Sequence, residues 1–282
     1  MTIEFVDKST AKLVQSNASD FMVAKAAWVS NFGKDGEVAL PADLVTDKWR
    51  LRYADSVSEL NLDDQKRIGG LINFLYRERH MSPFEHGSLT FVVDTPIFVA
   101  REFMRHRTFS YNETSGRYKE LEPRFYLIDS DRPVVQKGKV GAYSFDGGTD
   151  EQYGYTFAST TQSYQNSWGA YQNMLKCGVA REVARNVLPV GIMTQFYVTG
   201  NPRNWMQFFL LRNDKNALHE IRDVARQIEE QFAAQMPYVY EAYKKYDWRD
   251  ERTELLELRK KVKQLEAFES YAPNIAARES RW

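Results

Sequence analysis

The 282-residue sequence is poor in the features that mark secreted, membrane-spanning and nucleic-acid-binding proteins. Cys177 is its only cysteine, so the chain can form neither an internal disulfide nor a cysteine-based zinc site. Its 38 basic and 38 acidic side chains balance, which removes the bulk electrostatic case for nucleic acid or an anionic membrane. No apolar run approaches the roughly 20 residues that cross a bilayer, and the N-terminus has no signal-peptide pattern. We therefore expect a cytoplasmic protein, in the host cytoplasm if the source is a virus, with no nucleic-acid or membrane partner.

Metal chemistry has equally little support in the sequence. His80 and His86 flank a Ser-Pro turn, but the chain has no HExxH motif, and we expect no metal site. We expect Cys177 to be a small buried hydrophobic residue.

Aromatic residues are abundant instead, at 14%, which is typical of a folded globular protein. Alternating or β-rich segments predict strands, and apolar residues at three- and four-residue steps predict helices. The expected strands are 2–7, 88–94 and 193–200, and the expected helices are 19–32, 63–79, 96–104, 161–176, 180–188, 203–212 and 214–236. We expect Thr95 to cap the helix that begins at Pro96.

Glycines are concentrated between residues 130 and 160, which predicts an excursion or a hairpin. With no convincing interdomain linker, we expect one domain over residues 1–247, followed by a helical tail over residues 248–282. Apolar tail residues at helical steps are expected to pack on the body or on a partner helix. They are Leu255, Leu258, Val262 and Leu265.

The most informative segment is the polar run RHRTFSYNETSGRY at residues 105–118. It follows the apolar stretch 90–104, and dense polar groups beside a packed segment suggest a binding site. Arginine can bind phosphate or carboxylate through two parallel hydrogen bonds. In Ser115-Gly116-Arg117, the glycine allows backbone N–H groups to approach an anion beside a guanidinium. The alternative is a set of structural ion pairs with Glu113, Glu120 and Glu122.

The run 105–118 resembles the signature RHRxxSxNExSxR of the flavin-dependent thymidylate synthases at every fixed position. Residues 25–30, 80–104, 180–189 and 201–221 also resemble segments of that family. The resemblance covers residues 1–128 and 160–247. It implies an α+β fold with a mixed sheet flanked by helices, and a homotetramer whose active sites are shared between subunits. The domain over residues 1–247 would then be the catalytic domain.

The resemblance also implies an activity, the synthesis of dTMP by reductive methylation of dUMP. The carbon donor would be 5,10-methylenetetrahydrofolate, and FAD reduced by NADPH would supply the hydride. The expected small-molecule partners are therefore dUMP, the folate and NADPH. Classical thymidylate synthases attack the pyrimidine with a cysteine. Cys177 lies outside the signature, which fits a mechanism without an enzymic thiol nucleophile.

Carried over position by position, the resemblance assigns two groups of contacts. Those expected for FAD are Ser30, His80, Ser82, Arg105, His106, Arg107, Glu113, Asn201, Pro202, Arg203 and Gln207. Those expected for dUMP are Glu102, Phe103, Met104, Arg105, Glu113, Thr114, Ser115, Gly116, Arg117, Arg185 and Arg212. Arg117 and Arg185 would bind the phosphate. Arg212 would be the catalytic residue at the uracil edge, where a fixed cation favours ionisation of N3 and activates C5.

Three positions depart from the family's usual residues. Gln207 stands where Asn or His is usual, Asn216 where His is common, and Glu102 where Gln is frequent. A carboxylate beside a phosphate is unfavourable unless it orients an arginine. The departures put the flavin contacts in question and leave the two phosphate arginines intact.

Structural roles remain open for several of these side chains. Arg185 could be a structural ion-pair residue, and Arg212 could pair with Asp214 or Glu220. Ser110 has no adjoining general base, so we expect a structural hydroxyl. Two other functions also stay open. One is a nucleotide- or RNA-binding module that uses the arginines and tyrosines. The other is a catalytically weakened relative that serves in assembly.

Overall fold

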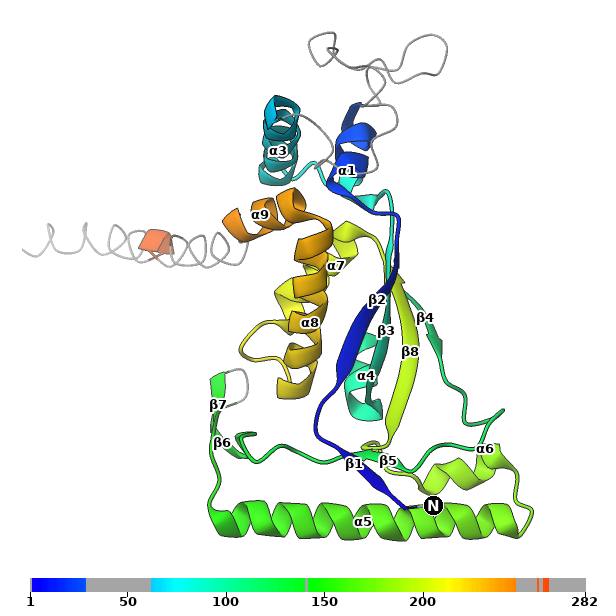
Figure 1. Cartoon of the computed structure of the whole chain (residues 1–282). Helices are drawn as coiled ribbons and strands as arrows, with labels where there is room; N and C mark the ends of the chain where they lie inside the picture. Colours follow the sequence, from blue (N-terminus) through cyan, green and yellow to red (C-terminus); the bar gives the residue numbers. More distant parts are fainter. Residues whose placement is uncertain (1, 29–61, 140–141, 247–257, 259–260, 264–282) are drawn as a thin grey trace, which may run out of the picture.

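The centre of the molecule is a four-stranded antiparallel sheet with strands in the order β2-β3-β8-β4 (Figure 1). The computed structural model describes residues 2–28, 62–139, 142–246, 258 and 261–263. The strands of the sheet are β2 (Thr10–Ser16), β3 (Leu89–Pro96), β8 (Met193–Gly200) and β4 (Ser110–Glu113). Parallel pairing lies outside this sheet, between β1 (Glu4–Val6) and β5 (Arg124–Tyr126). The expected α+β class is confirmed, while the expectation of one mixed sheet is corrected to an antiparallel sheet and a separate parallel pair.

The two faces of the central sheet differ in their surroundings. Alternate residues of β3, namely Leu89, Phe91 and Val93, are buried in the main core beneath α7 (Pro202–Arg212) and α8 (His219–Gln235). On the opposite face of β8, the Tyr197 side chain is 52% exposed. One face of the sheet therefore builds the core, and the other is open along β8.

Glutamines on α8 bind the backbone of the outer strand β2. Gln231 accepts from Leu13 N at 2.7 Å and donates to Ala11 O at 2.9 Å. One turn earlier, Gln227 accepts from Ala11 N at 3.0 Å and donates to Ser9 O at 3.0 Å. Because the two glutamines lie four residues apart, on one face of α8, their hydrogen bonds fix the position of this helix against the sheet.

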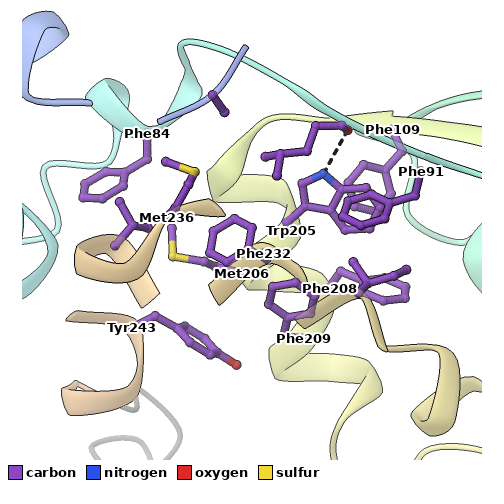
Figure 2. Close-up of a cluster of buried hydrophobic side chains, with 14 of the residues drawn as sticks. Phe84, Phe91, Phe109, Trp205, Met206, Phe208, Phe209, Phe232, Met236 and Tyr243 are labelled. Carbon is purple, nitrogen blue, oxygen red and sulfur yellow. Dashed lines mark hydrogen bonds between the residues drawn. The ribbon is translucent and has the colours of Figure 1, made fainter. Parts of the chain in front are cut away.

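The main core is dominated by aromatic side chains around α7 (Figure 2). Trp205 is fully buried, and its indole N–H donates to Leu89 O and Gly200 O at 3.3 and 3.1 Å. Its ring lies 4.4 Å from that of Phe109, in the signature segment, and 4.9 Å from that of Phe91. Truncating an aromatic side chain at such a site costs about 3–5 kcal/mol. This packing fixes α7 and the signature segment relative to the sheet.

Three helices pack together at one end of the molecule: α1 (Asp20–Ala27), α3 (Leu62–Arg77) and α9 (Pro237–Lys245) (Figure 1). The buried Asp20 carboxylate accepts from the backbone N–H groups of Tyr238 and Val239, at the start of α9. Burial raises the pKa of Asp20 to about 6, although the two backbone hydrogen bonds act against this rise. A carboxylate that ties two segments 218 residues apart is therefore also a titrating group near neutral pH.

The second core cluster lies between β5 and the long helix α5 (Asp150–Lys176), along one side of the molecule (Figure 1). Phe125 stacks on Tyr164 with ring centroids 4.8 Å apart. Helix α5 begins with a capping box in which Thr149 and Gln152 satisfy each other's backbone N–H groups. The helix therefore starts eleven residues before the expected position, and the excursion shrinks to the hairpin of β6 (Val135–Lys139) and β7 (Ala142–Asp146).

Several other expectations are corrected. Thr95 is not a helix cap, because it is buried in β3 with its hydroxyl 2.8 Å from that of Ser9, and α4 (Ile97–Phe103) follows Pro96. Cys177 is exposed, because it lies at the C-terminal cap of α5. Helix α8 begins at His219 rather than near residue 214, after a turn in which Asp214 accepts from Asn216 N.

The remaining helix and strand predictions agree with the structure where it describes the chain. Residues 29–32 of the first expected helix lie outside the described residues, as do Leu255 and Leu265 of the tail stripe. The two stripe residues that are described, Leu258 and Val262, are 56% and 51% exposed. Strand β2 and helix α9 were not predicted.

Candidate active site

Arg212 joins the C-terminal ends of α4 and α7. Its Nε donates to Nε2 of His106 at 2.9 Å. Its Nη1 donates to Oε2 of Glu102 at 2.6 Å, and its Nη2 donates to the Glu102 carbonyl oxygen at 3.0 Å. Glu220, one of the partners considered for Arg212, bonds instead to Arg132 and Tyr126. The expected catalytic arginine is thus held by two residues of the expected ligand-binding set.

The His106 ring is enclosed by aromatic side chains. Its centroid lies 4.9 Å from that of Phe208 and 5.9 Å from that of Phe109. Burial and, second, the charge of Arg212 lower the pKa of His106 to about 4. The ring is therefore neutral at pH 7. Because Nε2 accepts the Arg212 hydrogen bond, the proton of the neutral ring belongs on Nδ1.

Tyr111 fixes the turn between α4 and β4. Its hydroxyl lies 2.5 Å from Phe103 O and 3.1 Å from His106 O. Phe103 is the last residue of α4 and His106 follows it, and both carbonyl groups also accept from backbone N–H groups of this turn, those of His106 and Phe109. Burial raises the pKa of Tyr111, so its hydroxyl remains a donor at neutral pH. The backbone that carries Glu102 and His106 is consequently anchored from β4.

A second pair of cationic side chains consists of Arg117, in the turn after β4, and Arg185. The Nε of Arg117 donates to Oε2 of Glu182 at 3.0 Å, and both side chains are 54% exposed. Glu182 belongs to the short helix α6 (Arg181–Ala184), and the exposed Arg185 follows directly in η5 (Arg185–Val187). Two arginines with accessible guanidinium groups on adjoining segments suit a phosphate.

Gly116, next to Arg117, packs closely on Leu121. A Cβ atom at this position would lie 3.1–3.3 Å from the Leu121 side chain, which would have to shift by a few tenths of an ångström. The alternative to an anion site was a set of structural ion pairs with Glu113, Glu120 and Glu122. One such pair is present, because Lys119 lies 3.6 Å from Glu122. The other two acidic residues considered bond to neutral side chains: Gln172 donates to Glu120, and Thr194 donates to Glu113 at 2.7 Å.

Three of the segments assigned to FAD meet at the N-terminal end of α7. Arg203 forms an ion pair with Glu85, at the end of the turn η4 (Ser82–Glu85). Asn204 Nδ2 donates to Thr108 O at 3.0 Å. Asn201 caps α7 by accepting from Asn204 N at 2.9 Å. The structure thus brings residues 82–85, 105–109 and 201–207 together.

The other expected site residues have diverse surroundings. His80, Ser82, Met104, Arg105, Arg107 and Gln207 are exposed, Thr114 and Ser115 are partly buried, and Phe103 and Pro202 are buried. Phe103 stacks on Phe208 at 4.8 Å, so its side chain belongs to the core and only its backbone is placed to meet a ligand. Ser110 is a strand residue of β4, in keeping with a structural role. Ser30 lies outside the described residues.

Four polar residues of this region were missed in the sequence: Glu85, Tyr111, Glu182 and Asn204. Glu182 lies three residues before Arg185, and this helical step could have indicated that it faces the same side. The contacts of Glu85, Tyr111 and Asn204 depend on the chain path. No local pattern predicts them.

The described ranges contain neither a cluster of metal-ligating side chains nor a membrane-spanning helix. Within residues 2–28, 62–139, 142–246, 258 and 261–263, no group of three or more His, Cys, Asp or Glu could hold a metal ion. In the same part of the chain, no helix is both long and apolar enough to cross a membrane.

Comparison with known proteins shows the family to which this α+β chain belongs. The family model described as "Thymidylate synthase complementing protein" matches residues 12–238. A flavin-dependent thymidylate synthase of Streptomyces coelicolor is 43% identical over 249 residues, which cover 86% of this chain and 93% of that protein. One from Tropheryma whipplei (strain TW08/27) is 41% identical over 248 residues, with 86% and 94% coverage.

A solved structure extends the likeness to the fold. The UMP/dUMP methylase PolB from Streptomyces cacaoi, bound with 5-Br dUMP, superposes with a TM-score of 0.72 at 38% identity. The alignment covers 86% of this chain and 98% of that one. In fold and sequence the chain is thus similar to a UMP/dUMP methylase. The chain belongs to the family of flavin-dependent thymidylate synthases.

Proposed function

We propose that this protein makes dTMP by reductive methylation of dUMP, with 5,10-methylenetetrahydrofolate as carbon donor and NADPH as reductant. The observation that carries the proposal is Arg212, a guanidinium held against the signature segment by His106 and Glu102. Family membership supplies the reaction, and this arrangement supplies a fixed cation for it.

The chain's own residues have three tasks in this reaction. Arg117 and Arg185 bind the phosphate of dUMP. Arg212 lies at the uracil edge, where its charge stabilises the N3-deprotonated pyrimidine and raises the electron density at C5. His106 is neutral, so it accepts a hydrogen bond from Arg212 without placing a second positive charge beside it. Cys177 takes no part, because it lies outside the signature segment.

The residues assigned to FAD have a donor set that suits this cofactor. Arg105, Arg107 and Arg203 have exposed guanidinium groups on the segments 105–109 and 201–207, which meet along α7, and Arg203 also pairs with Glu85. FAD has a diphosphate that such groups bind. Bound FAD would accept a hydride from NADPH and supply it to the methylation. His80, Ser82, Glu113, Asn201, Pro202 and Gln207 would complete its contacts.

We also propose a homotetramer with active sites shared between subunits. Apolar side chains around the Arg117 group are exposed in the single chain, which supports contact with another copy. Val183, Val187 and Val190 are 52%, 40% and 50% exposed. Glu102 to Arg105 of one subunit and Glu113 to Arg117 of another would then hold one dUMP.

The test is an assay of the purified protein with FAD, NADPH, methylenetetrahydrofolate and dUMP. We expect dTMP, and a flavin spectrum that NADPH bleaches, that air restores and that dUMP perturbs. UMP is the matched control substrate, since PolB from Streptomyces cacaoi is a UMP/dUMP methylase. An unchanged spectrum together with RNA binding would favour the nucleotide- or RNA-binding module. Flavin binding without turnover would favour the weakened relative.

A further inference from the structure

We infer that Glu102 is a positioning residue that fixes the guanidinium of Arg212 for the pyrimidine. The inference rests on the proposed function, and it assigns Glu102 a role through Arg212 in place of direct contact with dUMP. Its basis is that the protein uses some of the N–H donors of Arg212 and leaves the others available to a ligand.

A guanidinium has five N–H donors in a planar fork. The protein uses three of them: Nε bonds to His106, Nη1 to the Glu102 carboxylate and Nη2 to the Glu102 carbonyl. One N–H on each terminal nitrogen is therefore left over. Because the three bonds fix the plane of the fork, the two remaining N–H groups have a defined direction and can reach adjacent acceptors of a ligand.

Arg212 is more buried than Glu102, as a positioning role for Glu102 requires. The Arg212 side chain is 17% exposed, whereas that of Glu102 is 40% exposed. Arg212 needs compensation for lost hydration, and a charge-assisted bond of 2.6 Å supplies it. Glu102 keeps contact with solvent, so its own desolvation costs less.

The other contacts of the cluster hold the geometry from the opposite side. His106 packs on Phe208, which lies four residues before Arg212 on α7 and therefore on the same face of that helix. Phe208 also stacks on Phe103, the neighbour of Glu102. Both ends of the Glu102–Arg212 pair are consequently set by one aromatic stack.

Direct binding of the dUMP phosphate by Glu102 is the rival role. A carboxylate repels a phosphate, and its pairing with Arg212 leaves it less able to accept from any donor of the nucleotide. The two roles predict different kinetics. A positioning residue acts on the step in which charge develops on the pyrimidine, whereas a binding residue acts on the affinity for dUMP.

The first experiment compares Glu102→Ala and Glu102→Gln in the full-length protein with bound FAD. Misplacing a catalytic group by about 1 Å can cost about 100-fold, so we expect Glu102→Ala to lower kcat by about 10–100-fold and to change KM for dUMP by less than about 3-fold. Glu102→Gln keeps an acceptor, and we expect it to retain kcat within about 5-fold of the wild type. Glu78→Gln, which weakens the exposed pair of Glu78 with Arg77, is the matched control and should leave both constants unchanged.

A double-mutant cycle with Arg212→Ala separates positioning from a general loss of structure. If Glu102 acts through Arg212, adding Glu102→Ala to Arg212→Ala costs nothing further, within about 2-fold. Additive losses, or a rise in KM alone, would overturn the inference. If Arg212→Ala leaves no measurable turnover, Arg212→Lys serves as the background, because it keeps the charge and loses the fork.

Crystal structures of the wild type and of Glu102→Ala give a readout that is independent of activity. We expect an ordered Arg212 guanidinium on His106 and residue 102 in the wild type, and a displaced or disordered one in the variant. An unmoved guanidinium would overturn the inference even if the enzyme is active. If the wild type makes no dTMP while its guanidinium depends on Glu102, the proposed reaction fails and the positioning contact stands.

Discussion

The Nε of Arg117 donates to Oε2 of Glu182 over 3.0 Å, which ties the turn after β4 to the short helix that precedes Arg185. The signature segment and a segment 65 residues later therefore form one cationic surface. Glu182 occupies the Nε edge of the guanidinium, so the terminal nitrogens of Arg117 are not engaged by that bond.

Removing either arginine of this surface should weaken dUMP binding. We expect Arg117→Ala and Arg185→Ala each to raise KM for dUMP by about 10–100-fold, because a charge-assisted hydrogen bond contributes about 1.5–3 kcal/mol. Steady-state kinetics with dUMP and with deoxyuridine, which lacks the phosphate, would check this. The preference for dUMP should shrink in both variants and persist in Arg226→Ala, whose exposed partner is Asp223. Equal losses with both substrates would contradict a phosphate contact.

Shared sites can be tested by mixing two impaired variants. Arg212 and Glu102 bond within one chain, whereas Arg117 belongs to the half of the signature that we assign to a neighbouring subunit's site. Co-expressed Arg117→Ala and Arg212→Ala chains should form some sites with neither substitution, so turnover at low dUMP should exceed that of either variant alone. The measurement is turnover of the co-purified hybrid against each homo-oligomer. A hybrid no more active than either parent, in a preparation of tetramer mass, would argue that each site uses one chain.

Asp20 should make stability depend on pH. Because its pKa is raised from 3.8 to about 6, the folded state holds a proton that the unfolded state releases between these values. Its favourable contribution is complete below pH 3.8 and is lost as the pH rises through 6. This shift corresponds to about 3 kcal/mol. Urea unfolding from pH 4 to pH 7 should thus show the wild type losing stability relative to Asp20→Asn. A constant difference between the two proteins would mean that the carboxyl group does not titrate in this range.

Cys177 should be reactive but dispensable. It is exposed at the end of α5, so one thiol per chain should react with Ellman's reagent in the native protein. Cys177→Ser should retain kcat within about 2-fold, since surface substitutions have small effects. Activity that disappears in Cys177→Ser, with the fold intact by circular dichroism, would restore a thiol to the mechanism.

The strand predicted at 88–94 is observed as β3, at 89–96, and the strand predicted at 193–200 is observed as β8, because alternation and β-branched residues are local signals. The start of α5 was missed because Gly147 and Gly148 precede it and Gly154 interrupts its first turns, although the Thr149–Gln152 capping box was present in the sequence. Thr95 looked like a cap, but tertiary pairing of β3 with β8 extends the strand through Pro96. Strand β2 was missed because it has no buried residue and depends on α8 for part of its hydrogen bonding.

For the candidate site, the resemblance singled out residues but could not pair them. Arg212 and Glu102 are 110 residues apart, and Arg212 had two closer acidic candidates in the sequence. The shift in the pKa of His106 likewise depends on burial beneath Phe208, which only the fold creates. Functional residue types were therefore predictable, whereas the bonds that orient them required the structure.

The glutamines of α8 also limit how this chain can associate with others. An edge strand with free N–H and C=O groups is a template on which a second molecule can add a strand, and such addition leads to aggregates. Gln227 and Gln231 occupy these groups at Ser9, Ala11 and Leu13. Strand addition at β2 would require α8 to detach first, so the helix protects this edge against intermolecular β-pairing in the native protein.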